Sequence, residues 1–420
     1  MNCEFSMVGA LAGLALAIFL IIRKVQPVYS LILGAFVGGL IGGGGLGGTV
    51  EIMVSGAQSM ISPVLRILTS GVLVGAMIKT GSTDRIAETI IHTFGEKRAI
   101  IAIALATMVI CAIGVFIPIA VITVAPIALA IGKQARIPVS AVLLAMIGGG
   151  KAGNIISPNP NTIAVAEAFG LNLTSLMVKN AVPAIVALGV TVLLSVLLSK
   201  IRKDIIRETE HLTTETDRKL PAFWQAVFGP CVVLVLLILR PLCGIEIDPL
   251  IALPAGGVVC ILVTGKAKSL AKCLEYGMGK VVGICVLLMS TGTLAGIIKA
   301  SDLQENMIAV LEMMNLPVFL LAPLSGMLLA AATASTTAGA TIASQTFGAT
   351  LLSAGVPALE AGAMINASAT VIDSMPHGSF FHASGGAVNM DMKERMKLIP
   401  FEALVGGSST VVAVILYIIK

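Results

Sequence analysis

The feature that most constrains the fold of this chain is a series of long apolar runs that carry almost no charge. Five of them come close to the roughly 20 apolar residues that an α-helix needs to cross a bilayer: Val8–Ile22, Ala99–Val115, Val182–Leu198, Ala222–Leu239 and Val281–Ile298. Only 12% of the 420 residues are charged, about half the share that soluble domains carry. The sequence therefore predicts an all-α polytopic membrane protein with about 12–14 transmembrane segments, broken or re-entrant helices included.

The first half of the chain can be aligned with the second half at a near-constant offset of 216 to 222 positions. Gly75–Lys79, for example, aligns with Ala295–Lys299. The matches are short, but they keep the same order over the whole chain, which is typical of an internal repeat. We predict two transmembrane repeats, 1–199 and 220–420, joined by a polar cytoplasmic linker at 200–219 that holds six basic and five acidic residues.

The charges between the apolar runs indicate that the two repeats face opposite ways. Lys and Arg collect in cytoplasmic loops. Residues 23–24 are basic, whereas their counterparts at 246–248 are acidic, and the loop predicted around Glu51 has a basic counterpart at 266–272. Inverted repeats of this kind are the architecture of secondary transporters that work by alternating access.

Each repeat also holds a hydrophobic segment that is interrupted at a matching place. In the first repeat, Val139–Ile147 is expected to break at Gly148–Asn154, before the polar stretch Ser157–Thr162. In the second repeat, Ala358–Val371 is expected to break at Asp373–Ser379. Paired interruptions are the best pointer in a sequence to a transport site.

Pro160 and Pro376 lie in these interruptions, 216 positions apart, and proline removes a helical hydrogen bond. Unwound backbone at membrane depth is tolerated only where it lines protein or a water cavity. It exposes carbonyls to a cation and a helix N-terminus to an anion. The substrate-binding candidates at the two breaks are Ser157, Asn159, Asn161, Thr162, Ser374, Gly378 and Ser379. The alternative is that they only cap and kink helices, as Asn159, Asn161 and Thr162 would do ahead of Ile163–Ala168.

A cluster of hydroxyl side chains precedes the second break, between positions 333 and 346. Ser335 and Thr336 are its substrate-binding candidates, because hydroxyls can contact a carboxylate or a cation. They could equally hold helices together inside a membrane. The equivalent stretch, Gly114–Pro126, lacks such a cluster apart from Thr123, so the expected site is asymmetric.

Asp373 is a carboxylate inside a predicted span, and His377 follows four residues later. A charge in lipid is costly and marks a functional candidate, and histidine titrates near physiological pH. The two residues are the ion-coupling candidates. Asp373 could alternatively cap the half-helix after Pro376. Lys151 could neutralise an anionic substrate, and Glu167 is expected at a helix interface.

The sequence offers no catalytic residues, no cofactor and no metal site. Gly148–Lys151 fails as a phosphate loop, because the pattern would need Gly at Ala145 and Ser or Thr at Ala152. The net charge of +5 is spread over loops without interleaved aromatics, which excludes nucleic acid as a partner. The seven cysteines show no C-x-x-C spacing, and most of them sit in apolar runs and are expected to be small buried hydrophobes.

The breaks resemble the gluconate permease family of proton symporters, within the ion transporter superfamily. The resemblance is carried by Ser157–Thr162, Ile372–Gly378 and Lys397–Gly406. It implies a multi-pass protein of the bacterial inner membrane that takes up gluconate, related sugar acids, D-serine or hydroxybutyrate-like acids with protons. Sugar-acid permeases carry Pro-Pro-His-Pro-Gly-Pro where this chain has Ser157–Thr162, a departure that weakens the prediction of gluconate specifically.

The resulting hypothesis is a secondary active symporter that carries a small anionic organic substrate with protons. Asp373 and His377 would handle the coupling ion. A sodium-coupled carboxylate symporter or a sodium/proton antiporter stays open as the alternative, whereas the inverted repeat disfavours a channel. The expected partners are the substrate, the coupling ion and the lipid bilayer, with a homodimer left open.

Overall fold

The computed structural model of the chain describes residues 5–201, 220–243, 247–302, 317–376 and 378–419, and these residues are overwhelmingly helical. The predicted linker at 200–219 lies outside the described residues except for Lys200 and Ile201, which end a helix. The all-α polytopic class is confirmed.

The first half contains eleven helices among the described residues. They are α1 (Met7–Ile22), α2 (Pro27–Ile41), α3 (Gly45–Gln58), α4 (Ile61–Lys79), α5 (Ser82–Phe94), α6 (Ala99–Ala112), α7 (Ile117–Gln134), α8 (Val139–Asn154), α9 (Pro160–Ala168), α10 (Leu173–Lys179) and α11 (Ala181–Ile201). Glu51 lies inside α3, so the loop predicted around it is wrong.

The described part of the second half contains nine helices. Its helices are α12 (Phe223–Cys243), α13 (Pro249–Val263), α14 (Leu270–Lys299), α16 (Leu321–Thr333), α17 (Thr336–Ser353), α18 (Ala358–Ser368), α19 (Ser379–Ala387), α20 (Met392–Met396) and α21 (Ile399–Ile418). Short 3-10 turns at Glu96–Arg98, Ala267–Ser269 and Val318–Leu320 precede α6, α14 and α16.

Helix contacts repeat between the halves as well. Helix α8 packs against α6 and α11, and α18 packs against α16 and α21. Contacts also cross from one half to the other in matched pairs: α9 packs on α17 while α19 packs on α7, and α4 packs on α13 while α14 packs on α2. The opposite orientation of the halves in a membrane stays a prediction.

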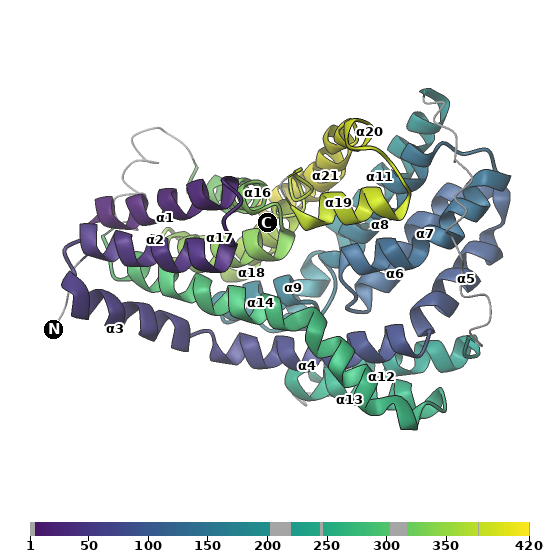
Figure 1. The fold of residues 1–420 in the computed structure, drawn as a ribbon, viewed down its shortest axis with the longest axis horizontal. Helices are drawn as coiled ribbons and strands as arrows, with labels where there is room; N and C mark the ends of the chain where they lie inside the picture. The colour runs from purple at the N-terminus through teal and green to yellow at the C-terminus, as the bar shows by residue number, and fades with distance from the viewer. Residues whose placement is uncertain (1–4, 202–219, 244–246, 303–316, 377, 420) are drawn as a thin grey trace.

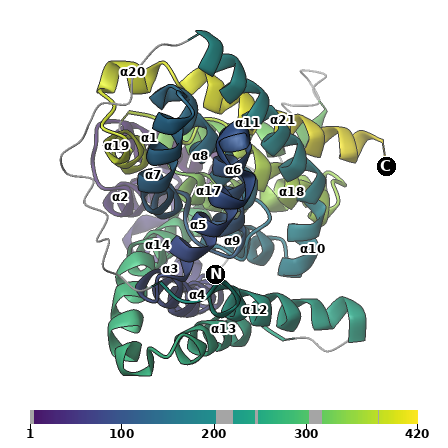
Figure 2. The same ribbon diagram turned by 90° about the vertical axis from the view of Figure 1, so that its right-hand side faces the viewer.

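Helices α1, α2 and α3 lie at one end of the long axis, and α5, α6 and α7 lie at the other (Figure 1). Helices α4 and α14 pack together and run along the molecule, and Figure 2 places α12 and α13 beside them at one edge. Helices α8, α17 and α18 lie toward the middle in Figure 2. The two interrupted segments therefore sit inside the bundle.

Five stretches of the described chain are long and apolar enough to cross a membrane: Ile61–Lys79, Ile117–Gln134, Ala181–Ile201, Ala267–Lys299 and Met392–Ile418. Shorter apolar helices of 10–17 residues accompany them. Large apolar side chains such as Ile185, Leu193 and Val411 are more than half exposed. A surface of this kind is compatible with hydrocarbon and not with water.

The predicted break at Gly148–Asn154 is wrong, because these residues are the last turns of α8. Glycine is there for packing. A Cβ at Gly149 would lie 2.1 Å from the Ala104 carbonyl oxygen, and a Cβ at Gly153 would lie 2.2 Å from the Met108 carbonyl oxygen. Small residues of this kind let two membrane helices approach closely, and here they bring α8 against α6.

The true breaks are 155–159, between α8 and α9, and, among the described residues, 369–376 with 378, between α18 and α19. The second break starts earlier than predicted, since α18 ends at Ser368 and Ala358–Val371 is not helical throughout. Pro160 occupies the first turn of α9, where its missing N–H costs no hydrogen bond.

Candidate functional site

Asn366, near the C-terminal end of α18, links this helix to α9 and to the first break. Its Oδ1 accepts a hydrogen bond from Asn161 Nδ2 at 2.9 Å, and its own Nδ2 donates to the Ile155 carbonyl oxygen at 3.1 Å. Both asparagines are buried. A buried amide that satisfies partners from two elements fixes their relative position, because losing either hydrogen bond leaves a desolvated polar group.

Asn159 organises the first break. Its Oδ1 accepts from the Thr162 backbone N–H at 3.1 Å, which caps α9 as predicted, while Asn161 and Thr162 form the first turn instead of the cap. Asn159 Nδ2 donates to the Asn154 side-chain oxygen at 2.6 Å. The Asn154 Nδ2 donor and the Ser157 hydroxyl are buried without a hydrogen-bond partner among the described residues.

Asp373 organises the second break. Lys151 Nζ lies 2.7 Å from its Oδ1, the Thr336 hydroxyl donates to its Oδ2 at 2.6 Å, and the Ser374 hydroxyl donates to its Oδ1 at 3.2 Å. Lys151 also donates to the Thr370 carbonyl oxygen at 2.5 Å. The carboxylate is therefore neutralised and hydrogen-bonded on both oxygens.

Asp373 does not cap the half-helix that follows, so that alternative is wrong. The N-cap of α19 is Gly378, and no side chain bonds there. Glycine fits because a Cβ at this position would lie 2.5 Å from the Ala334 Cβ, at the start of α17. His377 lies outside the described residues, and His382 Nε2 lies 2.9 Å from the Pro376 carbonyl oxygen.

A cavity of about 330 Å³ opens between the two breaks. Of the predicted site residues, its lining includes Asn161, Ser335, Thr336, Asp373 and Ser379. Five other predicted residues that the structure describes are buried but are not part of this lining: Ser157, Asn159, Thr162, Ser374 and Gly378. The structure adds Asn154, Thr337 and Lys280 to the lining.

Helix N-termini converge on this cavity. Its wall contains residues 116–119 at the start of α7, Asn161 in the first turn of α9, residues 334–337 at the start of α17, and residues 379–380 at the start of α19. Each N-terminus exposes backbone N–H groups and the positive end of a helix dipole. Asn154, at the C-terminal end of α8, also lines the cavity. The arrangement attracts a small anion.

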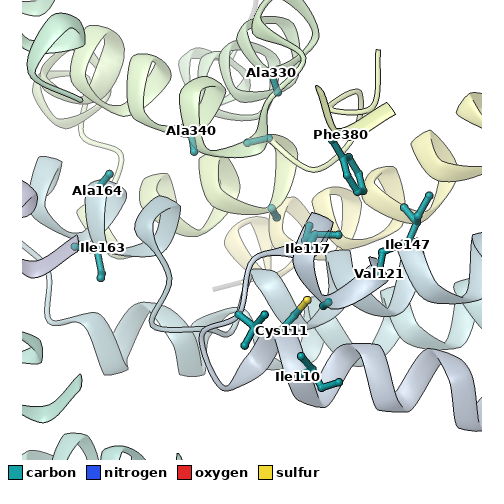
Figure 3. Close-up of a cluster of buried hydrophobic side chains, with 14 of the residues drawn as sticks. Ile110, Cys111, Ile117, Val121, Ile147, Ile163, Ala164, Ala330, Ala340 and Phe380 are labelled. Atoms are coloured by element: carbon teal, nitrogen blue, oxygen red, sulfur yellow. The ribbon is translucent and has the colours of Figure 1, made fainter. Parts of the chain in front are cut away.

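An apolar layer surrounds the polar groups. Figure 3 shows Ile117 of α7 close to Phe380 of α19, and Ile163 and Ala164 of α9 on the side of Ala340 of α17. These side chains belong to one continuous buried cluster. An apolar wall with a few polar groups is the usual composition of a small-molecule site.

A second cluster of charged side chains lies at the C-terminal end of α9. The Arg66 guanidinium of α4 donates from Nη2 to Asp248 Oδ2 at 2.7 Å and from Nη1 to Glu167 at the C-terminal end of α9. Glu167 thus lies at a helix interface, as predicted. The hydrogen bond from Arg66 lowers the pKa of the Asp248 carboxyl, against a smaller opposing effect of burial. These three residues border a cavity of about 260 Å³.

Sequence reasoning missed Arg66, Lys280 and the bridging amide Asn366. Asn366 carried a usable signal, since a primary amide inside a predicted apolar span needs a buried partner. The partners themselves are distant in sequence and carry no local signature. Within the described chain, no three His, Cys, Asp or Glu side chains gather as metal ligands would.

The fold and the cavity together indicate the class of membrane protein to which this chain belongs. An all-helical chain with several membrane-length helices, interrupted twice to build one polar cavity, is a multi-pass membrane transporter. The comparisons with known proteins then place it: the model of the GntP family permeases matches residues 5–249, and the chain belongs to this family. The protein is a multi-pass protein of the inner membrane.

The relatives span a range of similarity. An uncharacterized transporter of Haemophilus influenzae is 50% identical over 98% of both chains. The L-idonate transporter of Escherichia coli is 26% identical, over 56% of this chain and 54% of its own. The D-serine transporter of Escherichia coli is 22% identical over 78% of this chain and 79% of its own. The fold is similar to that of the Alcanivorax borkumensis YdaH transporter, with a TM-score of 0.67, 15% identity and 87% coverage of both chains.

Proposed function

We propose that this protein is a proton-coupled symporter that imports a small organic carboxylate, of the gluconate or hydroxy-acid type, by alternating access. The observation that carries the proposal is the convergence of the α7, α9, α17 and α19 N-termini on one cavity that Asp373 also lines. Relatives named for L-idonate and gluconate support an acid as the substrate.

The cavity suits an anion that also carries hydroxyl groups. The helix N-termini supply the positive potential, while the lining residues Ser335, Thr336, Thr337, Asn161 and Ser379 present hydroxyls and an amide. A polyhydroxy or hydroxy acid offers the matching carboxylate and acceptors. A volume of about 330 Å³ is at the lower end for ligand sites, which suits a small acid.

The Lys151–Asp373 pair provides a physical route to coupling. A proton that binds Asp373 removes the negative charge and leaves the buried Lys151 ammonium without a counter-charge. An uncompensated buried charge costs several kcal/mol, and an anion in the adjacent cavity reduces that cost. Proton binding and anion binding therefore favour each other, which is the linkage that a proton symporter needs. His377 stays a candidate for the same proton.

The test is uptake into proteoliposomes that hold the purified protein. With an inward proton gradient, we expect D-gluconate or glycerate to accumulate above the outside concentration, and a protonophore should abolish accumulation. Accumulation that survives the protonophore and needs sodium would replace the proton with sodium. Ion exchange without any organic acid would instead indicate an antiporter.

A further inference from the structure

Among the described residues, two charged side chains line the substrate cavity, Asp373 and Lys280. Asp373 is already neutralised by Lys151, which is itself almost fully buried. Within the part of the chain that the structure describes, the charge of Lys280 therefore remains as the net side-chain charge of the cavity lining.

Lys280 has no acidic partner in the part of the chain that the structure describes. Its ammonium lies 4.9 Å from the centre of the Tyr276 ring, and Lys79 lies 4.4 Å from the centre of the same ring. Two cations thus contact one aromatic ring. Lys280 is an exposed residue of the membrane-length stretch Ala267–Lys299, where a charge needs a partner, water or the membrane interface to stabilise it.

The first half has no charged residue at the position that corresponds to Lys280. Under the offset of 216 to 222 positions, its counterpart falls within residues 58–64, a stretch without any Lys, Arg, Asp or Glu. The fold therefore does not need a charge at this register. A lysine that occurs in one repeat, borders the cavity and lacks an acidic partner is best explained by the ligand.

We infer that Lys280 is a specificity-determining residue that ion-pairs with the substrate carboxylate. This inference rests on the proposed function and adds the residue that selects a monoanion over a neutral analogue. A charge-assisted contact discriminates strongly, because the neutral analogue leaves the ammonium unpaired.

The experiment measures proteoliposome uptake of D-gluconate together with its inhibition by the neutral analogue D-gluconamide. Lys280→Gln should raise the KM for D-gluconate about tenfold, and the inhibition constant of D-gluconamide should stay within about twofold. Lys280→Arg should restore most of the affinity. Lys272→Gln, an exposed lysine on the same helix that does not line the cavity, is the matched control and should behave as wild type.

An unchanged KM in Lys280→Gln would overturn the inference and leave the proposed function standing. An equal loss for D-gluconate and D-gluconamide would also overturn it, because that result indicates damage to packing. Wild-type protein that takes up neither D-gluconate nor glycerate, in a preparation that melts cooperatively, would overturn the proposed function instead. The two failures are therefore distinguishable.

Discussion

Lys151 Nζ lies 2.7 Å from Asp373 Oδ1, and each side chain is 1% exposed. The lysine lies in the last turn of α8 in the first half, and the aspartate lies in the break between α18 and α19 in the second half. One buried charge pair thus connects the two halves next to the substrate cavity. The energetic cost of separating the pair is the basis of the first two predictions.

Lys151→Met should destabilise the protein by about 3–5 kcal/mol, because it leaves the Asp373 carboxylate buried without its counter-charge. The double variant Lys151→Met/Asp373→Asn should recover most of this loss, since both charges are gone. Thermal unfolding in detergent, arranged as a double-mutant cycle, measures the coupling. Simple addition of the two single effects would contradict the pairing.

Asp373→Asn should uncouple transport from the proton gradient. The amide cannot release or bind a proton in the physiological range, so the substrate should equilibrate or exchange without accumulating. Proteoliposome counterflow and gradient-driven uptake of D-gluconate measure the two properties separately. Full accumulation by this variant, at a stability that supports folding, would remove Asp373 from the coupling role.

The helical class and the presence of an interruption in each half were predictable, although the first interruption begins later than predicted. Long apolar runs fix membrane helices, Pro376 disfavours helix in the second break, and Pro160 marks the start of α9. Asn159 was recognisable as an N-cap, because its short polar side chain precedes a new helix. These are local properties of the chain, which a sequence displays directly.

The contacts between distant residues were not predictable. Lys151 and Asp373 lie 222 positions apart, and Arg66 and Asp248 lie 182 apart, so nothing near either residue indicates its partner. Glycine was misleading for a related reason. Gly149 and Gly153 serve the packing of α8 on α6, which a sequence cannot distinguish from a break in the helix.

The glycines of α8 provide a prediction about that packing. Gly149→Ala would place a Cβ 2.1 Å from the Ala104 carbonyl oxygen, which forces α6 and α8 apart, and we expect a loss of about 1–3 kcal/mol. Gly189→Ala in α11 is the matched control, because a Cβ there meets nothing within 4 Å. It should be neutral or slightly stabilising, as alanine favours helix. The melting temperatures of both variants, measured by thermal unfolding in detergent, test this prediction. Equal melting temperatures for the two would refute close packing as the role of Gly149.

The hydrogen bond from Arg66 holds the pKa of the Asp248 carboxyl below its ordinary value, which is about 3.9. A lowered pKa adds stability that is fully present above the ordinary value and is lost as the pH falls through the lowered one. Wild-type protein should therefore lose melting temperature from about pH 5 to about pH 3. Asp248→Asn should show a shallower loss there, since asparagine still caps α13 but cannot titrate.

Glu275→Gln, at an exposed position on α14, is the control and should follow the wild-type profile. Scanning fluorimetry in detergent at matched ionic strength measures all three. An Asp248→Asn profile parallel to wild type would show that the Arg66 contact does not stabilise the fold through this carboxylate.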